Sequence, residues 1–369
     1  MTVEAENMAP RNKVLIVIQC ADLGGMERAT LRSVELLKKH GVEVSILSLN
    51  PFNGLEVLCR NKDIPISMLP HYHGMSGLAD IAALVRHIRR ERPTRVWCVG
   101  HNLGSVIAGK LSGVPTFLSL HYHHNVTPMW KWRIIYAVSC FCCRKLHFVS
   151  HFIFDQVKHW FKEPEKTMVF CNSLPESPPL PRSARKRWGL PEDAVVIGNA
   201  GRLQYRKAFD VFLHTAAIVA ERIPNARFLI AGDGPERAAL EELARRLNIA
   251  DKVVFAGWLR DMAGFWSSID LLLFNTRFDC LPEVPLEAVM HSIPVVASIE
   301  SCGLYELLNE HGGFMFRGHD PLVLADAVCT VVRMSADEKR RLTAEHKKHL
   351  LMRGSSEPHW DCLKRFLEI

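Results

Sequence analysis

Two carboxylates eight positions apart are the first residues whose spacing suggests chemistry. Asp279 and Glu287 flank a stretch that contains two prolines, Pro282 and Pro285. Pro285 suits the first position of a helix, because its missing N–H would have no partner within the helix there. We therefore expect Glu287 in the first turn of a short helix, where unpaired backbone amides favour a carboxylate and would equally favour a bound phosphate.

Apolar segments on both sides of the acidic pair predict the elements that position it. The run 269–274 is rich in branched and aromatic side chains and predicts a strand before the pair, and the run 294–297 predicts a strand after it. The order is therefore strand, loop, helix, strand. Open parallel sheets bind ligands at the carboxyl ends of their strands, so the pair lies where such a sheet would hold a substrate.

Two cations, Arg202 and Lys207, follow another predicted strand at 195–200. Cationic side chains at the carboxyl end of a strand can bind a diphosphate and stabilise the negative charge that develops on it as it leaves. Solvated surface cations are the alternative interpretation. The second half of the sequence thus offers a cationic pair and an acidic pair that could converge on one anionic substrate.

These two stretches resemble the retaining glycosyltransferases of family 4, which have the GT-B fold. The segment FDCLPEVPLEA is similar to the E-x7-E element of that family, with Asp279 at its first glutamate and Glu287 at its second. The segment GRLQYRKA is similar to its G-R-L-x-x-x-K-G loop, with Ala208 at the last glycine. Asp279 keeps the charge of a glutamate but is shorter by one methylene group. The resemblance covers most of the chain and is strongest from 201 to 296.

The resemblance implies a role for each of these side chains in moving a sugar from a nucleoside diphosphate. Glu287 would accept hydrogen bonds from the ribose hydroxyls, Asp279 would contact the donor sugar, and Arg202 with Lys207 would stabilise the departing diphosphate. The family usually needs no metal, and no aspartate of this sequence forms a D-x-D. No side chain stands out as a covalent nucleophile. We therefore expect same-face attack by the acceptor hydroxyl and no cofactor besides the donor.

The resemblance also implies further donor contacts, some in loops after other predicted strands and two between Asp279 and Glu287. These contacts are Gly24, Gly25, Gly232, Gly234, Leu259, Leu281 and Glu283. His121 occupies the position of a histidine that commonly faces the donor sugar in the family, and a loop histidine without a ligand is the alternative interpretation. For His123 and His124 a loop histidine is the preferred interpretation, because a metal cluster there would lack nearby carboxylates.

Alternation of strand-like and helix-like segments predicts an α/β fold with mainly parallel sheets. Predicted strands of the first half are 13–20, 42–47, 95–99, 116–120 and 146–149, with helices at 26–40 and 78–91. Those of the second half include 195–200, 228–231 and 253–255. A proline-rich segment, 173–182, predicts a linker between an acceptor-binding domain (1–172) and a nucleotide-sugar-binding domain (183–345). The resemblance implies that these are two Rossmann-like domains facing across a cleft, with a C-terminal helix (346–369) crossing back.

The composition is that of an ordinary globular protein, with 48% hydrophobic and 23% charged residues in 369. The polar amino terminus does not read as a signal peptide, and no apolar run approaches the ~20 residues that span a bilayer, so we expect a cytoplasmic protein. The eleven cysteines fit reduced thiols better than a disulfide framework. Cys140, Cys142 and Cys143 are interpreted as helix packing, with a metal or redox role as the alternative.

The net charge of +7 is concentrated in the first half of the chain. Residues 1–172 contain 21 Lys and Arg against 13 Asp and Glu, whereas residues 173–369 contain 25 against 26. Aromatic and basic residues also interleave between 129 and 162, as suits the interface of an anionic membrane. We expect an anionic partner for the first domain, either a membrane surface or a phosphate-bearing acceptor. We expect no nucleic acid, because no recognition motif is present.

The function that these features predict is a retaining glycosyltransferase. It would move a hexose or N-acetylhexosamine from a UDP- or GDP-linked sugar to an acceptor hydroxyl in the synthesis of lipopolysaccharide, capsule or a lipid-linked glycan. A glycoside phosphorylase or hydrolase is the alternative enzyme, and it would release sugar from a glycoside without any nucleotide. A non-catalytic nucleotide-sugar sensor is the alternative of another class, and it would bind without turnover.

Overall fold

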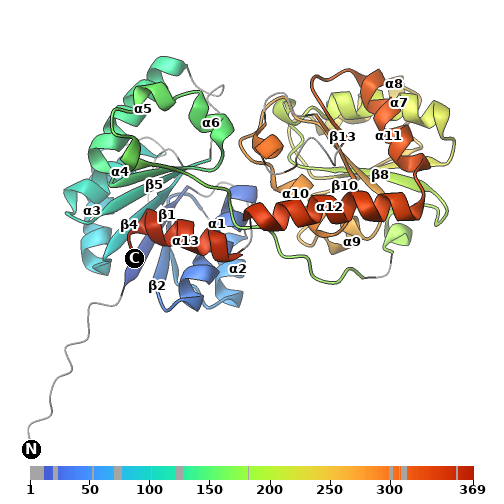
Figure 1. Cartoon of the computed structure of the whole chain (residues 1–369). Helices are drawn as coiled ribbons and strands as arrows, with labels where there is room; N and C mark the ends of the chain where they lie inside the picture. Colours follow the sequence, from blue (N-terminus) through green and yellow to red (C-terminus); the bar gives the residue numbers. More distant parts are fainter. Residues whose placement is uncertain are drawn as a thin grey trace, which may run out of the picture. The chain divides into compact units, whose positions relative to one another are not determined.

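The computed structural model describes most of the chain (Figure 1). The described residues are 12–19, 24–51, 54–69, 77–100, 102–121, 128–181, 183–298, 302–306, 308, 314–354 and 356–369. They divide into two compact units. The first unit is Met1–Ser173 together with Gly354–Ile369, and the second unit is Leu174–Arg353. Each unit is built around its own parallel sheet.

The sheet of the first unit has the strand order β3-β2-β1-β4-β5-β6-β7, and all of its pairings are parallel. Its strands are β1 (Lys13–Ile18), β2 (Glu43–Ser48), β3 (Ile66–Met68), β4 (Arg95–Val99), β5 (Thr116–Leu120), β6 (Lys145–Phe148) and β7 (Thr167–Val169). The order reverses between β1 and β4. Open sheets of this kind bind ligands at that point, beyond the carboxyl ends of the strands.

Helices cover both faces of this sheet, as right-handed crossovers between parallel strands require (Figure 1). Helices α1 (Gly25–Lys39), α2 (Leu55–Asn61) and α13 (Ser356–Leu367) lie on one face, and α3 (Leu78–Glu91), α4 (Leu103–Leu111) and α5 (Met129–Cys142) lie on the other. Shorter turns follow at α6 (His151–Asp155), η2 (Lys158–Trp160) and η3 (Pro164–Lys166). The core against α1 and α13 is formed by apolar side chains of β1, β2 and β4.

The last helix, α13, belongs to the first unit because its apolar side chains complete that core. Phe366 is fully buried and meets the rings of Trp97 and Phe117 edge-on, with centroids 6.2 and 5.6 Å away. The helix end is also hydrogen-bonded, since Arg95 Nε donates to the carbonyl of Leu367 at 2.6 Å. Residues from the two ends of the chain therefore share one hydrophobic core.

The second unit repeats the design with the strand order β10-β9-β8-β11-β12-β13, again with every strand pairing parallel. Its strands are β8 (Val195–Ala200), β9 (Ala226–Ala231), β10 (Val253–Gly257), β11 (Leu271–Phe274), β12 (Val295–Ser298) and β13 (Phe314–Phe316). Its helices are α7 (Phe209–Arg222), α8 (Arg237–Arg246), α9 (Ala263–Trp266), α10 (Glu283–Met290), α11 (Pro321–Arg333) and α12 (Ala336–Gly354), with short turns at η4 (Arg185–Trp188), η5 (Tyr205–Lys207) and η6 (Gly303–Glu306). The order reverses between β8 and β11.

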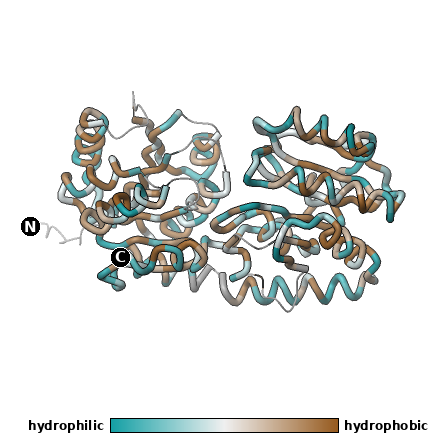
Figure 2. Tube along the Cα trace, turned by 90° about the horizontal axis from the view of Figure 1, so that it is seen from above, coloured by the Kyte–Doolittle hydropathy of each residue, from teal (hydrophilic) through white to brown (hydrophobic). Residues whose placement is uncertain are grey.

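The distribution of hydropathy explains why these strands lie inside. Figure 2 shows apolar segments in the interior of each unit and hydrophilic residues on the outer turns of the helices. Strands covered on both faces need apolar residues at successive positions rather than in alternation, and β11 is buried throughout. A main core cluster of the second unit lies between the sheet and helices α7 and α11.

The predicted α/β fold with parallel sheets is confirmed. Strands β4, β5 and β8 and helix α3 have the predicted bounds. The sequence analysis did not identify β3, β7 and β13, which are edge strands of three residues each and so carry little periodic signal. Among the described residues, no helix is both long enough and apolar enough to cross a bilayer.

Candidate active site

The candidate site of the second unit lies where the loops after β8 and β11 meet. These two strands are neighbours in the sheet and run parallel, so both of their carboxyl ends point to the same edge. The loop after β8 carries Lys207, and the loop after β11 carries Asp279. Both loops flank the position where the strand order reverses, which is the ligand-binding edge of a doubly wound sheet.

Lys207 and Asp279 form an ion pair in which Lys207 Nζ donates to Oδ2 of Asp279. Arg206 approaches the same oxygen, with Nη1 at 3.3 Å. The other carboxylate oxygen, Oδ1, accepts the backbone N–H of Cys280 at 2.9 Å. The side chains of Lys207 and Asp279 are each only 13% exposed, so this charge cluster is held largely away from solvent.

The Asp279 carboxylate is ionised at neutral pH. Burial by itself would raise its pKa, but the charges of Lys207 and Arg206 and the hydrogen bond from Lys207 outweigh burial and hold the pKa below its usual value. Lys207 also lies 5.8 Å from the ring centroid of Phe274. The cluster has two cations for one carboxylate and can therefore accept a further anion, such as a diphosphate, without accumulating excess negative charge.

A second set of contacts joins the same two loops. Arg277 binds the carboxylate of Asp210 through Nη1 at 3.0 Å and Nη2 at 2.6 Å, and Nη1 also donates to the carbonyl of Tyr205 at 2.6 Å. The backbone N–H of Arg277 and the hydroxyl of Thr276 both donate to the carbonyl of Arg206, at 2.8 and 2.9 Å. Because η5 is tied to the β11 loop on both sides of Lys207, the position of that ammonium group is fixed by the fold.

Gly232 and Gly234 lie in the neighbouring loop after β9, where the backbone is too close for a side chain. A Cβ on Gly232 would lie 1.9 Å from the carbonyl oxygen of Gly201, and a Cβ on Gly234 would lie 2.4 Å from that of Leu203. The loops are also hydrogen-bonded, since the N–H of Leu203 donates to the Asp233 carbonyl at 2.9 Å. The close packing of these loops therefore requires glycine at both positions, whether or not a ligand binds there. Whether they also contact a donor stays a prediction.

Helix α10 begins earlier than expected, and the predicted position of Glu287 is wrong. The helix starts at Glu283, with Pro282 as its N-cap, so Pro285 is the third helical residue and Glu287 the fifth. Proline is tolerated at the third position, because the N–H groups of the first turn have no intrahelical partner. Glu283 therefore takes the first-turn position expected for Glu287, and it is 8% exposed.

The remaining predicted residues of the second unit have different exposures. Arg202 is exposed, Glu287 and Leu259 are half-buried, and Leu281 is buried at 6% exposure. Glu287 lies one turn along α10 from Glu283, and Arg202 directly follows Gly201 at the end of β8. Among the described residues, the structure brings Lys207 and Asp279 into contact. The ligand roles of all these residues stay predictions.

In the first unit, Gly24 is the N-cap of α1 and Gly25 its first residue. The predicted helix began one residue later. The Gly24 N–H donates to Oε2 of Glu27 at 2.9 Å, and Glu27 is buried at 5% exposure. A carboxylate of the chain therefore already lies at this helix N-terminus, where an anion is favoured. Gly24 and Gly25 as donor contacts stay predictions.

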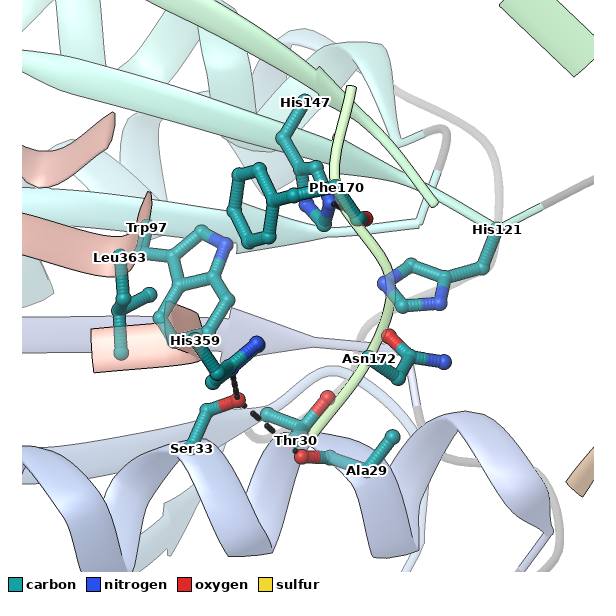
Figure 3. A pocket seen from close by; sticks show the side chains of 10 residues that line it. All are labelled: Ala29, Thr30, Ser33, Trp97, His121, His147, Phe170, Asn172, His359 and Leu363. Carbon is teal, nitrogen blue, oxygen red and sulfur yellow. Dashed lines mark hydrogen bonds between the residues drawn. The ribbon is translucent and has the colours of Figure 1, made fainter. Parts of the chain in front are cut away.

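His121 follows β5 in the first unit and lines a small cavity (Figure 3). The cavity has a volume of about 10 Å³, room for about one water molecule. Its wall also contains His147 and His359, and the ring of His121 meets that of His147 edge-on at 6.3 Å between centroids. Burial lowers the pKa of His121 to about 4, so its ring is neutral at pH 7. The predicted loop histidines 123 and 124 lie outside the described residues.

The other two histidines hold the chain where it leaves the first unit. His147 Nε2 lies 2.8 Å from the carbonyl oxygen of Phe170, and His359 Nδ1 lies 3.1 Å from that of Cys171. A carbonyl can only accept, so each of these ring nitrogens carries the proton. His359 Nε2 in turn contacts the hydroxyl of Ser33 at 3.0 Å (Figure 3). This network links α13 and α1 to the segment that precedes Leu174, the start of the second unit.

The described part of the chain contains free cysteines and no cluster of metal-binding side chains. No group of three or more His, Cys, Asp or Glu residues there could hold a metal ion. Ten described cysteines, including Cys140, Cys142 and Cys143, are free thiols. Burial raises the pKa of all three of these thiols, so they are neutral at pH 7. Cys140 and Cys142 lie in α5, and Cys143 is its C-cap.

Sequence reasoning missed three residues at the site. Arg206 lies within the GRLQYRKA motif but at a position that the motif leaves open, and Arg277 precedes the acidic pair by two residues. Asn275 follows β11, is 1% exposed, and its amide oxygen and nitrogen have no hydrogen-bond partner among the described residues. A buried amide of this kind normally binds water or a ligand group. A polar residue directly after a buried strand was the signal that could have identified it.

Comparison with known proteins assigns both halves of the chain to glycosyltransferase families. The family model described as "Glycosyltransferase Family 4" matches residues 23–176, and the one described as "Glycosyl transferases group 1" matches residues 194–334. The two matches together cover most of the chain. They fall on the first and second units, respectively.

The sequences of curated relatives match this chain over part of their length. A D-inositol 3-phosphate glycosyltransferase of Stackebrandtia nassauensis is 33% identical over 45% of this chain and 40% of its own length. The lipopolysaccharide core biosynthesis glycosyltransferase LpsD of Rhizobium meliloti is 31% identical over 46% of this chain and 47% of its own length. The chain thus matches about half the length, or less, of these relatives.

Solved structures resemble the chain over nearly its whole length. The crystal structure of Anabaena HepE in complex with UDP and glucose superimposes with a TM-score of 0.83 and 17% sequence identity, covering 97% of this chain and 100% of HepE. At this identity the likeness establishes the fold. Together with the two family matches, it shows that the chain belongs to the glycosyltransferases of the GT-B type, with a family 4 domain followed by a group 1 domain.

Proposed function

We propose that this protein is a retaining glycosyltransferase that moves a hexose or N-acetylhexosamine from a nucleoside-diphosphate sugar to an acceptor hydroxyl. The observation that carries the proposal is the cluster of Lys207, Arg206 and Asp279 at the edge of the sheet where its strand order reverses. It combines cations for a diphosphate with an ionised carboxylate for a sugar hydroxyl in one place.

In the proposed reaction, the bond between the anomeric carbon and the diphosphate oxygen breaks as the acceptor oxygen attacks from the same face. The acceptor proton passes to the departing phosphate oxygen, so no residue of the chain needs to become a covalent intermediate. Lys207 and Arg202 would stabilise the negative charge that develops on the diphosphate. Glu287 would bind the ribose, and Asp279 would orient the sugar ring. His121, neutral at pH 7, would donate a hydrogen bond to a sugar hydroxyl.

A uridine nucleotide is the first donor to test, with a guanosine nucleotide as the alternative. HepE, whose fold this chain shares, was crystallised with UDP and glucose. We propose a glycan or glycolipid acceptor, because two relatives of this chain from Rhizobium meliloti, LpsD and LpsE, are lipopolysaccharide core biosynthesis glycosyltransferases. The free thiols of the described residues fit a reducing, cytoplasmic compartment.

A thermal-shift screen of nucleoside diphosphates and their sugars tests the donor site. A ligand that binds the native state alone raises the melting temperature, and we expect UDP or UDP-sugars to do so. Two measurements then detect transfer. The first is the release of the nucleoside diphosphate, and the second is the anomeric configuration of the product. An inverted product would reject the retaining mechanism.

The alternative functions give different results in the same assays. A phosphorylase or hydrolase would release sugar from a glycoside in the absence of a nucleotide. A nucleotide-sugar sensor would show a thermal shift without turnover, and substitution of Asp279 would leave binding unchanged. Turnover that requires both the nucleotide sugar and an acceptor would exclude both.

A further inference from the structure

Arg206 is the most exposed side chain of the charge cluster that it forms with Lys207 and Asp279. Its side chain is 36% exposed, whereas those of Lys207 and Asp279 are each 13% exposed. Arg206 Nη1 lies 3.3 Å from Oδ2 of Asp279, and this contact engages one of the five N–H donors of a guanidinium group. Arg206 can therefore contact Asp279 and bind a further group at the same time.

The loop after β11 holds the backbone of Arg206 in place. The carbonyl of Arg206 accepts the N–H of Arg277 at 2.8 Å and the hydroxyl of Thr276 at 2.9 Å. Within η5, the N–H of Lys207 also donates to the carbonyl of Gln204 at 2.8 Å. A side chain on a fixed backbone loses less freedom when it binds a ligand, so this position suits recognition.

The Asp279 carboxylate has little capacity left for neutral sugar hydroxyls. An ionised carboxylate offers about four acceptor positions. Three of these are used, because Oδ2 accepts from Lys207 and Arg206 and Oδ1 accepts the N–H of Cys280 at 2.9 Å. What the cluster mainly offers a ligand is therefore the set of N–H donors of Arg206.

The charges of the cluster do not cancel. Lys207 and Arg206 carry two positive charges against one negative charge on Asp279, and Lys207 donates directly to that carboxylate. Arg206 is thus the surplus cation. In the proposed reaction Asp279 faces the sugar, so a side chain that contacts Asp279 would lie on the sugar's side of the site. A negative group on the sugar would compensate the charge of Arg206.

We propose that the transferred sugar is a hexuronic acid, whose carboxylate pairs with the Nε and Nη2 edge of Arg206. The contact with Asp279 does not use this edge. Arginine matches a carboxylate with two parallel hydrogen bonds, and such charged pairs are stronger than hydrogen bonds between neutral groups. The inference rests on the proposed function and narrows its donor to the acid form of a hexose. The same bonds form and break, because the carboxylate takes no part in the transfer.

A neutral sugar suits this site less well. Glucose would offer Arg206 a hydroxyl, and N-acetylglucosamine would offer it an amide carbonyl, and both form weaker hydrogen bonds with a guanidinium than a carboxylate does. The diphosphate is another anion that Arg206 could bind. Affinity for the nucleoside diphosphate without its sugar distinguishes these two partners.

Isothermal titration with UDP, UDP-glucose, UDP-N-acetylglucosamine and UDP-glucuronic acid tests the proposal. We expect UDP-glucuronic acid to bind at least about tenfold more tightly than UDP-glucose, as one charged hydrogen-bonded contact allows. Arg206→Gln should remove this preference and change the affinity for UDP by less than about twofold. If the thermal-shift screen identifies a guanosine nucleotide, then GDP, GDP-mannose and GDP-mannuronic acid are the ligands.

A matched control is Arg222→Gln, because the side chain of Arg222 is also 36% exposed and pairs with one carboxylate, that of Asp326. This variant should keep the preference for the acidic sugar. Arg206→Lys should keep part of it, since an ammonium group retains the charge but not the planar pair. Melting temperatures check that the variants fold, and kcat/KM for transfer should follow the same order as binding.

Three results would overturn the proposal. UDP-glucose or UDP-N-acetylglucosamine could bind as tightly as UDP-glucuronic acid, or Arg206→Gln could retain the preference for the acidic sugar. Alternatively, Arg206→Gln could weaken UDP as much as UDP-glucuronic acid, which would assign Arg206 to the diphosphate. Transfer of neutral sugars alone would reject this inference and keep the proposed function. Binding without any transfer would contradict the proposed function instead.

Discussion

Arg277 and Asp210 face each other through two parallel hydrogen bonds, Nη1 to Oδ1 at 3.0 Å and Nη2 to Oδ2 at 2.6 Å. The guanidinium carbon also lies 4.1 Å from the ring centroid of Tyr205. This pairing joins the loop after β11 to the start of α7 and so encloses η5, which carries Lys207. The geometry of the charge cluster depends on this link.

Arg277→Ala should therefore reduce transfer without removing any predicted ligand contact. We expect kcat/KM to fall by about tenfold, because misplacement of Lys207 weakens transition-state stabilisation. Folding stability should fall by only about 1 kcal/mol, since the Asp210 side chain is 43% exposed. Arg222→Ala is the control, because Arg222 forms a comparable pair with Asp326 on the surface of α7 and α11. Equal losses of activity in the two variants would contradict the positioning role.

Asp279→Asn should lower transfer by at least about tenfold and change stability in a pH-dependent way. The folded pKa of Asp279 is depressed, so the ion pair contributes fully above the unfolded pKa of about 4 and is lost as pH falls through the folded value. Urea unfolding should show the wild type more stable than the variant at pH 7, with the difference shrinking below about pH 4. A difference that stayed constant with pH would show that the carboxylate charge does not stabilise the fold.

Arg202→Ala should weaken binding of the nucleoside diphosphate by about 1.5–3 kcal/mol, the range for a hydrogen bond to a charged group. Isothermal titration with the nucleotide found in the thermal-shift screen measures this change. Arg245→Ala on α8 is the control, because Arg245 pairs with Glu242 on the helix surface. Unchanged affinity in Arg202→Ala would remove Arg202 from the site.

His359→Asn should make the protein less sensitive to mild acid. Burial lowers the pKa of His359 to about 4, so the unfolded chain takes up the proton first and stability falls as pH drops from about 6.5 to 4. That loss is up to about 3 kcal/mol. Asparagine can still donate to the Cys171 carbonyl but does not titrate. Unfolding experiments across this pH range should show a shallower slope for His359→Asn than for the wild type, and no change for the exposed control His159→Asn.

Gly234→Ala should destabilise the second unit by about 2 kcal/mol or more, because the new Cβ would overlap the Leu203 carbonyl. Gly264→Ala is a matched control. Its Cβ would meet Ala184 at an ordinary 3.5 Å, and removing glycine from α9 reduces the entropy of the unfolded chain. We expect that variant to match or exceed wild-type stability in a chemical unfolding experiment. If both variants behaved alike, the close approach of the two loops would not be a real constraint.

The sequence by itself determined the α/β class, the parallel sheets and the loops that carry the candidate site. Buried strands such as β5 and β8 appear as short apolar runs, because parallel strands are covered on both faces. Three edge strands, β3, β7 and β13, were not predicted, and α10 was predicted to start at Pro285 instead of Glu283, since short segments and helix ends depend on few local interactions. The motif residues themselves were found by resemblance, and their ligand roles await the experiments above.

Only the tertiary structure decided which charges meet. Lys207 and Asp279 come together because β8 and β11 are neighbours in the sheet, although β9 and β10 separate them in sequence. Arg206 and Arg277 acquire significance from that adjacency and not from their local sequence. The sequence of α5 likewise does not show which of its apolar residues are buried and which are exposed. Packing on the sheet buried Trp132 and left Trp130 facing outward, because a helix can cover the sheet with only one of its faces.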